Sequence, residues 1–188
     1  AFANCKSLET VSFGTGLENV GQSAFENCNS LKSVSFVKLK SIGGYAFRNC
    51  TNLTEVTIPK TLTGIGIEAF KNCIALKTVT MPTEQSALET IFQGAFENCT
   101  SIESIEIPMC YVIISNDSFK NCTNLQYFSA ANISAIVGTN VFDGCTKLTS
   151  IEYGKTLSIW NKVSKSDGWS DGSYITEIHC TDSTVIIE

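Results

Sequence analysis

Positive charge is scarce in this sequence. Of its 188 residues, 13 are Lys or Arg and 18 are Asp or Glu, which gives a formal net charge of −5, and Arg48 is the only arginine. A protein that binds nucleic acid or an anionic membrane surface needs a basic patch that can neutralise phosphates. We therefore expect neither of these as a partner.

A long hydrophobic run is also missing. The longest stretch without charge, residues 121–142, is interrupted by polar residues such as Asn124, Gln126, Asn132, Ser134 and Asn140, so we expect it to belong to the fold and not to insert into a membrane. The first five residues fit the repeat described below and not a signal peptide, so the chain is expected to be part of a longer protein. With 43% hydrophobic residues it can bury a substantial core.

Residues for catalysis or metal binding are few. His179 is the only histidine, no Cys-x-x-Cys pair occurs, and Cys180 should point to the opposite side of a strand from His179. A Ser-His-Asp or Cys-His set needs its members on one face. We expect no enzymatic activity, no metal and no cofactor.

What the sequence does contain is a repeat. A Phe recurs with gaps of 23, 22, 23, 26, 23 and 23 residues, Cys follows three residues later in every copy, and Asn follows two residues later except at Gly144. Five residues before each internal Phe comes Val or Ile. A degenerate eighth copy fits if Trp169 takes the Phe position, since Ile175, Ile178 and Cys180 then fill its apolar positions. The anchors are Phe2, Phe25, Phe47, Phe70, Phe96, Phe119 and Phe142, and the preceding aliphatic residues are Val20, Ile42, Ile65, Ile91, Ile114 and Val137.

Each copy contains the pattern L-x-x-V-x-I, whose alternation predicts a short β-strand. One repeat is too small to bury its own apolar residues, so the copies should stack as rungs of a solenoid with a parallel sheet on the order of 35 Å long. Pro59, Pro82 and Pro108 come just after the predicted strands and should end them. The repeated Asn is expected to face inward and satisfy amides of the turns.

The repeated motif A-F-x-N-C-x-x-L-x-x-V-x-I-P, seen from Ala69 to Pro82 and in its sibling copies, resembles the BspA-like leucine-rich repeats over nearly the whole chain. The resemblance implies a right-handed, curved leucine-rich-repeat solenoid of about eight rungs, with a parallel β-sheet on the concave face and irregular or short-helical return segments. Residues 1–153 would form seven rungs, and residues 154–188 a degenerate eighth rung and C-terminal cap. It also implies a cell-surface or secreted protein that adheres to proteins, possibly host matrix proteins, and has no catalytic residues.

The cysteines of the repeat occupy one equivalent position and should form a column of buried free thiols. Parallel side chains one rung apart are poorly placed for disulfides. Cys110 lies outside this column, after Pro108, and is the one candidate for a reactive thiol, although ordinary packing explains it as well. The column consists of Cys5, Cys28, Cys50, Cys73, Cys99, Cys122 and Cys145.

The two residues that flank the Val of each strand should point away from the core and form the concave surface. This surface is rich in Ser and Thr and contains four carboxylates but no Lys or Arg. Aromatic side chains often anchor interfaces and carboxylates set charge preference. The predicted binding residues are Glu55, Glu106, Tyr127, Glu152, Glu177 and His179.

Two hypotheses of function stay open. In the first, the chain is a protein-binding module; in the second, the rungs are a structural spacer in a larger surface protein and bind no ligand. An ice-binding array of hydroxyls, as at Thr78 and Thr80, is a weaker idea because Glu55 and Glu106 interrupt it. The repeats carry no signal for a particular oligomeric state.

Overall fold

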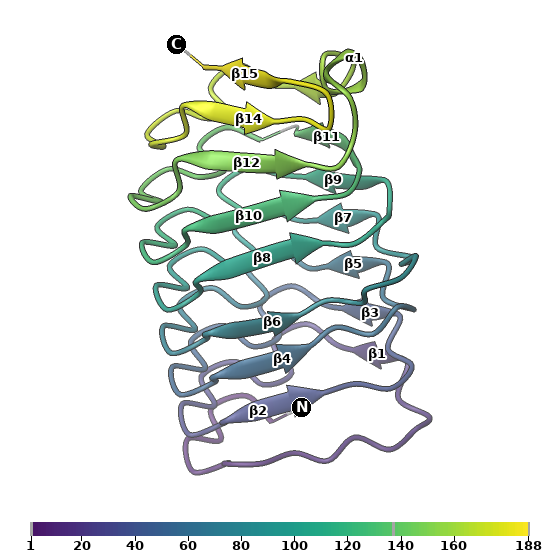
Figure 1. Cartoon of the computed structure of the whole chain (residues 1–188). Coiled ribbons are helices and arrows are strands. Elements are labelled where there is room, and N and C mark those ends of the chain that lie inside the picture. The colour runs from purple at the N-terminus through teal and green to yellow at the C-terminus, as the bar shows by residue number, and fades with distance from the viewer. Residues whose placement is uncertain (1, 137, 188) are drawn as a thin grey trace.

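The chain forms a solenoid whose repeats build two parallel β-sheets facing each other. The computed structural model describes residues 2–136 and 138–187. The longer strands of each repeat lie in one layer, which we call the long-strand sheet, and Figure 1 shows them stacked in sequence order from β2 to β14. They are β2 (Ser33–Ser35), β4 (Glu55–Thr57), β6 (Thr78–Thr80), β8 (Ser104–Ile107), β10 (Tyr127–Ala130), β12 (Ser150–Tyr153) and β14 (Glu177–His179).

These strands coincide with the L-x-x-V-x-I segments, so the strand prediction is confirmed. An isolated bridge between Thr10 and Ser33 extends the layer by one more repeat. At the other end, β15 (Thr184–Ile186) pairs antiparallel with β14 and closes the layer. Hydrogen-bonded pairing is interrupted between β6 and β8, which divides the layer into a group of three strands and a group of five. The interruption falls in the repeat that has the 26-residue gap between Phe70 and Phe96.

The return segments form a second parallel sheet, the short-strand sheet, behind the first in Figure 1. The return segments, expected to be irregular or short-helical, thus also contain short parallel strands between their turns. Five of the seven strands of this sheet contain the aliphatic residue that lies five positions before a Phe, and the side chain of that residue is buried. The seven strands are β1 (Asn19–Val20), β3 (Ser41–Ile42), β5 (Gly64–Ile65), β7 (Thr90–Ile91), β9 (Val112–Ile114), β11 (Ile133–Ile136) and β13 (Ser164–Lys165).

One predicted position of this sheet, Val137, lies outside the described residues. In the described part, Ile136 of β11 pairs with Ile114 of β9. The uncharged stretch 121–142 thus supplies β10 and β11, two strands of the solenoid. Within the described residues, the structure contains no helix whose length and hydropathy would let it cross a membrane.

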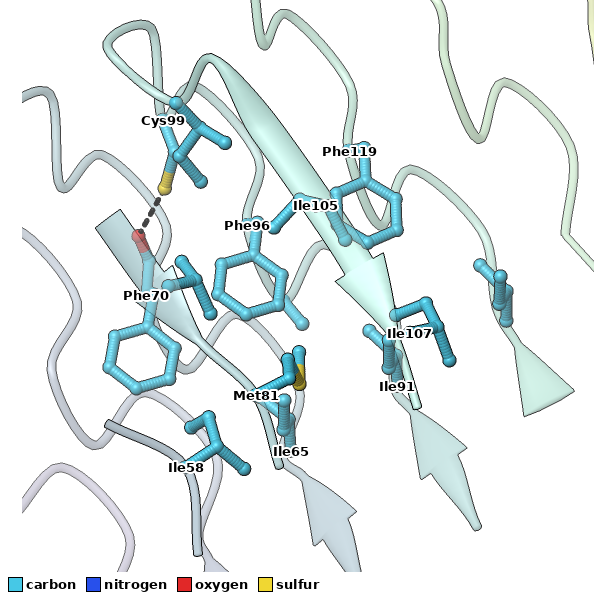
Figure 2. Close-up of a cluster of buried hydrophobic side chains, with 14 of the residues drawn as sticks. Ile58, Ile65, Phe70, Met81, Ile91, Phe96, Cys99, Ile105, Ile107 and Phe119 are labelled. Carbon is cyan, nitrogen blue, oxygen red and sulfur yellow. Dashed lines mark hydrogen bonds between the residues drawn. The ribbon is translucent and has the colours of Figure 1, made fainter. Parts of the chain in front are cut away.

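The core between the two sheets is organised around the repeated Phe. From Phe2 to Phe142 the rings stack nearly parallel, with centroids 5.2–5.7 Å apart and interplanar angles of 2–10°. Figure 2 shows Phe70, Phe96 and Phe119 in a row, with Ile105 and Ile107 of the long-strand sheet and Ile65 and Ile91 of the short-strand sheet around them. Stacking aromatic rings at this separation adds to the area that they bury. Each ring thus fixes the register of the next repeat.

The repeated cysteines hold the turns between rungs. From Cys28 to Cys145, each repeated thiol donates a hydrogen bond of 3.0–3.2 Å to the main-chain oxygen of the Phe one repeat earlier, as Cys99 does to Phe70. All nine cysteines of the chain are free thiols. The prediction of a buried column is confirmed for six of its members and is wrong for Cys5, which is exposed.

The repeated Asn plays a different part from the one predicted. Asn27 donates its side-chain amide to the amide oxygen of Asn4, and the same bond of 2.7–3.0 Å recurs along the column to Asn121. The side chains are half-buried from Asn27 onward and bond one another instead of turn amides. Their backbone has φ near 60°, a conformation that Asn tolerates better than most residues. Asn therefore suits this position for two reasons, its tolerance of positive φ and the hydrogen bonds of its side chain.

The last repeat departs from the others around Trp169. In the repeats from Phe25 to Phe142, the residues two positions before and two positions after the Phe have positive φ. In the last repeat the corresponding residues are Gly168 and Gly172, so Ser170 occupies the position of the Phe. Trp169 thus sits one position early, and its ring meets Phe142 edge-on at 82°. A short helix, α1 (Leu157–Trp160), occupies the added residues before it. Ile175 and Ile178 are nevertheless buried, as predicted.

Candidate binding site

The exposed side of the long-strand sheet carries two rows of side chains, one from each residue that flanks the central Val or its equivalent. Every one of these residues is exposed or half-buried, whereas the residue between them is buried in strands β2 to β14. Strand pairing puts Glu106, Ser129, Glu152 and His179 side by side in one row, across β8, β10, β12 and β14. Tyr127 lies in the other row, beside Ser104. The fold therefore converts the period of the sequence into fixed side-chain spacing.

A groove of about 760 Å³ runs along this surface from β6 to β14. Its floor includes Thr80, Glu106, Ser129, Glu152 and His179, and Tyr127 lines it as well. The residues that follow each strand supply further contacts at its edge. These are Met81, Pro82, Thr83, Pro108, Met109, Ala131, Gly154, Cys180 and Thr181.

His179 joins two carboxylates at the β14 end of the groove. Its Nδ1 lies 2.6 Å from Oε1 of Glu152, and its Nε2 lies 2.8 Å from Oε2 of Glu177. A neutral imidazole can donate from only one nitrogen, whereas the protonated ring can donate to both carboxylates. The hydrogen bonds to Glu177 and Glu152 accordingly raise the pKa of His179. The imidazole is half-exposed, so the two contacts remain accessible to solvent.

The structure gathers most of the predicted binding residues. Glu106, Tyr127, Glu152 and His179 line the groove, and Glu177 reaches it through His179. Glu55 lies apart, on β4 in the other group of strands, and does not line the groove.

Sequence reasoning missed the apolar edge of the groove. Met109 is 57% exposed, and Met81, although buried in the core, also lines the groove. Met81 fills the last apolar position of the strand pattern and Met109 follows Pro108, whereas Pro82 and Pro108 were assigned only the role of ending strands. The available signal was the 26-residue gap between Phe70 and Phe96, because its additional residues cannot fit the regular rung and have to lie outside it.

The remaining chemical candidates are weak. Burial raises the pKa of Cys110 to about 11, and its thiol lies 3.4 Å from the main-chain oxygen of Pro108. A thiol with such a pKa is a poor nucleophile at neutral pH. Among the described residues, no group of three or more His, Cys, Asp or Glu side chains is placed to hold a metal ion.

Comparison with known proteins agrees with this architecture. The family model described as the BspA type leucine rich repeat region matches six copies of the repeat over residues 1–91 and 40–167. The chain belongs to the BspA-type leucine-rich-repeat family. The family expected from the motif is thereby confirmed, and with it a parallel solenoid of the kind found in leucine-rich-repeat proteins. No curated protein matches this BspA-type chain.

Solved structures similar to this BspA-type chain come from bacteria. A leucine-rich repeat protein from Bacteroides ovatus is 30% identical, with a TM-score of 0.69, and the match covers 95% of this chain and 50% of that one. A leucine rich cell surface protein from Faecalibacterium prausnitzii is 22% identical, with a TM-score of 0.64, over 95% of this chain and 56% of that one. The leucine rich repeat protein of T. pallidum is 22% identical, with a TM-score of 0.65, over 91% and 81% of the two chains. The chain spans about half the length of the first two proteins.

Proposed function

We propose that this chain is a protein-binding module of a cell-surface or secreted protein, and that the groove on its long-strand sheet is the contact surface. The observation that carries the proposal is Tyr127, a tyrosine 43% exposed in the groove and placed among carboxylates on neighbouring strands. Tyr is enriched among the residues that dominate binding energy at interfaces. The strands beneath it hold the site in a fixed geometry before any ligand arrives.

The surface location is supported by the description of one structural neighbour as a leucine rich cell surface protein. Leucine-rich repeats stack into extended surfaces that serve binding more often than catalysis. The proposal therefore assigns no reaction to this chain and no cofactor. Adhesion to a host matrix protein is the form of binding that we propose to test first.

The test is a binding measurement with the chain itself on immobilised extracellular-matrix proteins and glycans. We expect saturable binding to at least one matrix protein, reduced about tenfold or more by Tyr127→Ala, because truncating an aromatic anchor commonly costs over about 1.4 kcal/mol. Glu152→Gln should also weaken it. Glu55→Gln, on the same sheet but outside the groove, is the matched control and should bind as the unmodified protein does.

Two results would argue against the proposal. If the whole panel gives no binding above background, the second hypothesis gains support, in which the rungs form a structural spacer without a ligand. The stacked Phe, Cys and Asn columns would suit a stiff spacer, because each rung is bonded to the next. If a matrix protein binds but Tyr127→Ala leaves the affinity unchanged, the contact surface lies elsewhere on the chain.

A further inference from the structure

The carboxylates of the groove have a spacing that can select the conformation of a ligand. Glu106 and Glu152 occupy equivalent positions on β8 and β12, with Ser129 of β10 between them. Neighbouring strands are about 4.8 Å apart, so two steps separate the two glutamates by about 9.6 Å along the solenoid axis. A ligand that contacts both must present cationic groups at that interval.

A polyproline-II helix meets this requirement. It has three residues per turn and rises about 3.1 Å per residue, so residues i and i+3 point the same way about 9.3 Å apart. A β-strand presents its side chains on one face about 6.6 Å apart, or about 13 Å for every second one, and neither value matches. A strand would also add to a sheet edge, whereas this groove lies on the face of the sheet.

Tyr127 supplies the second element of such recognition. It lies on β10, the strand between the two glutamates, and faces the same side as Ser129. Grooves lined with aromatic side chains bind polyproline-II segments in several unrelated domains, because the rigid ligand loses little conformational entropy. Met109, after β8, adds exposed apolar surface at the edge of the groove. A pyrrolidine ring could therefore pack between these two side chains.

The charge of the groove points to a cationic ligand. Its described lining includes Glu106, Glu152 and His179 and no Lys or Arg, and Glu177 is bonded to His179. Glu152 shares one oxygen with His179 and leaves the other free. Electrostatic complementarity of this kind gives specificity more than raw affinity.

We propose that the groove binds an extended polypeptide in the polyproline-II conformation, with Lys or Arg at every third residue, lying along the solenoid axis from β8 to β14. Three strand steps give about 14 Å, room for about five residues of such a helix. This inference rests on the proposed function, because it names the kind of protein segment that the same groove accepts.

The experiment compares three blocked octapeptides by isothermal titration calorimetry at low salt and pH 8. The first is Pro-Pro-Lys-Pro-Pro-Lys-Pro-Pro, which spaces its lysines three apart. The second is its isomer Pro-Pro-Pro-Lys-Lys-Pro-Pro-Pro, and the third replaces both lysines of the first by Glu. We expect the first to bind about three- to fivefold more tightly than its isomer, the difference that one exposed charge pair can make. The Glu peptide should not bind.

Variants locate the contact. Glu106→Gln and Glu152→Gln should each weaken the first peptide about two- to fivefold and abolish its preference over the isomer. Tyr127→Ala should weaken both lysine peptides about tenfold. Glu55→Gln is the control and should change neither. Raising the salt concentration should reduce the affinity of both lysine peptides, because exposed charges are screened.

The outcomes separate this inference from the proposed function. Equal affinity for the two lysine isomers, or no effect of Glu106→Gln and Glu152→Gln, overturns the inference. If at the same time a matrix protein binds the chain and Tyr127→Ala weakens that binding, the proposed function stands and only the ligand conformation is wrong. If the peptide with lysines three apart binds as expected but no matrix protein binds, the inference about the groove stands and the proposal of a matrix protein as the partner is wrong.

Discussion

The thiol of Cys99 donates a hydrogen bond of 3.1 Å to the main-chain oxygen of Phe70, one repeat earlier. Both residues are fully buried, so that oxygen has no water to accept from. The same oxygen accepts from the main-chain amide of Cys73 at 3.1 Å, so the thiol supplies a second hydrogen bond, which a column of apolar side chains would lack. The repeated Cys is therefore better explained by the donor that it brings to the core than by redox or metal chemistry.

Removing that donor should destabilise the fold. Cys99→Ala removes one of the two hydrogen bonds to the buried oxygen of Phe70 and leaves a small cavity where the sulfur packed, so we expect the free energy of unfolding to fall by about 1–2 kcal/mol. Denaturant titration followed by circular dichroism measures this. Cys5→Ala, at the exposed member of the same column, is the control and should change the value by less than about 0.5 kcal/mol. Equal losses from the two substitutions would contradict the explanation.

The accessibility of the thiols gives a second prediction. Burial raises the pKa of Cys50 to about 12, so at pH 8 only about 10⁻⁴ of that thiol is ionised. In the native protein, iodoacetamide should modify Cys5 first and the half-buried Cys180 more slowly, and mass spectrometry should find the other cysteines protected. All nine should react in denaturant. Rapid native labelling of Cys110 would restore it as a candidate reactive thiol.

Close approach of backbones between rungs predicts a large effect at one glycine. A Cβ on Gly66 would lie 2.5 Å from the main-chain carbon of Gly43, which no side-chain rotation can relieve. Gly66→Ala should lower the free energy of unfolding by about 1–3 kcal/mol through overpacking, measured by thermal or denaturant unfolding. Gly21 occupies the equivalent position four residues before its Phe and meets nothing within 4 Å. Gly21→Ala should therefore be tolerated, and a loss as large as that of Gly66→Ala would refute the steric argument.

The sequence predicted the long strands, the core Phe positions and the outward residues because a period of about 23 residues fixes which side chains repeat and alternation fixes which way they point. It did not predict the short-strand sheet. Segments such as Ser41–Ile42 contribute two residues each, too few to show alternation, and they form a sheet only because the stacked Phe rings bring them into register. The apolar edge of the groove was missed for other reasons. Met81 fills an inward apolar position of the repeat and still lines the groove, and Met109 lies beyond the strand pattern, where the sequence gives no direction.

A column of charges along the turns predicts a salt-sensitive contribution to stability. From Phe25 onward the residue after each repeated Phe is charged, as in Glu26, Arg48 and Lys71. Nε of Arg48 lies 2.8 Å from the carboxylate of Glu26, and its guanidinium also contacts Glu68 at 3.2 Å. Arg48→Met should lower the free energy of unfolding by about 1 kcal/mol, and by less in 1 M NaCl, where exposed charges are screened. Lys32→Met, which removes the more exposed pair with Glu9, is the control and should have a smaller effect. A loss for Arg48→Met that does not depend on salt would point to packing instead of charge.

The two carboxylates around His179 predict how stability depends on pH. Bonds to Glu177 and Glu152 raise the pKa of the folded imidazole above its ordinary value of 6.5. The proton is then held more tightly in the folded than in the unfolded state, so its contribution is fully present below pH 6.5 and is lost as the pH rises through the folded pKa. The difference in melting temperature between the unmodified protein and His179→Gln should be about 1–2 °C at pH 6 and should shrink towards pH 9, because the half-exposed imidazole is screened by water. In Glu152→Gln/Glu177→Gln, adding His179→Gln should produce no such pH-dependent change. A constant difference between pH 6 and pH 9 would mean that His179 stabilises the sheet by contact and not through its charge.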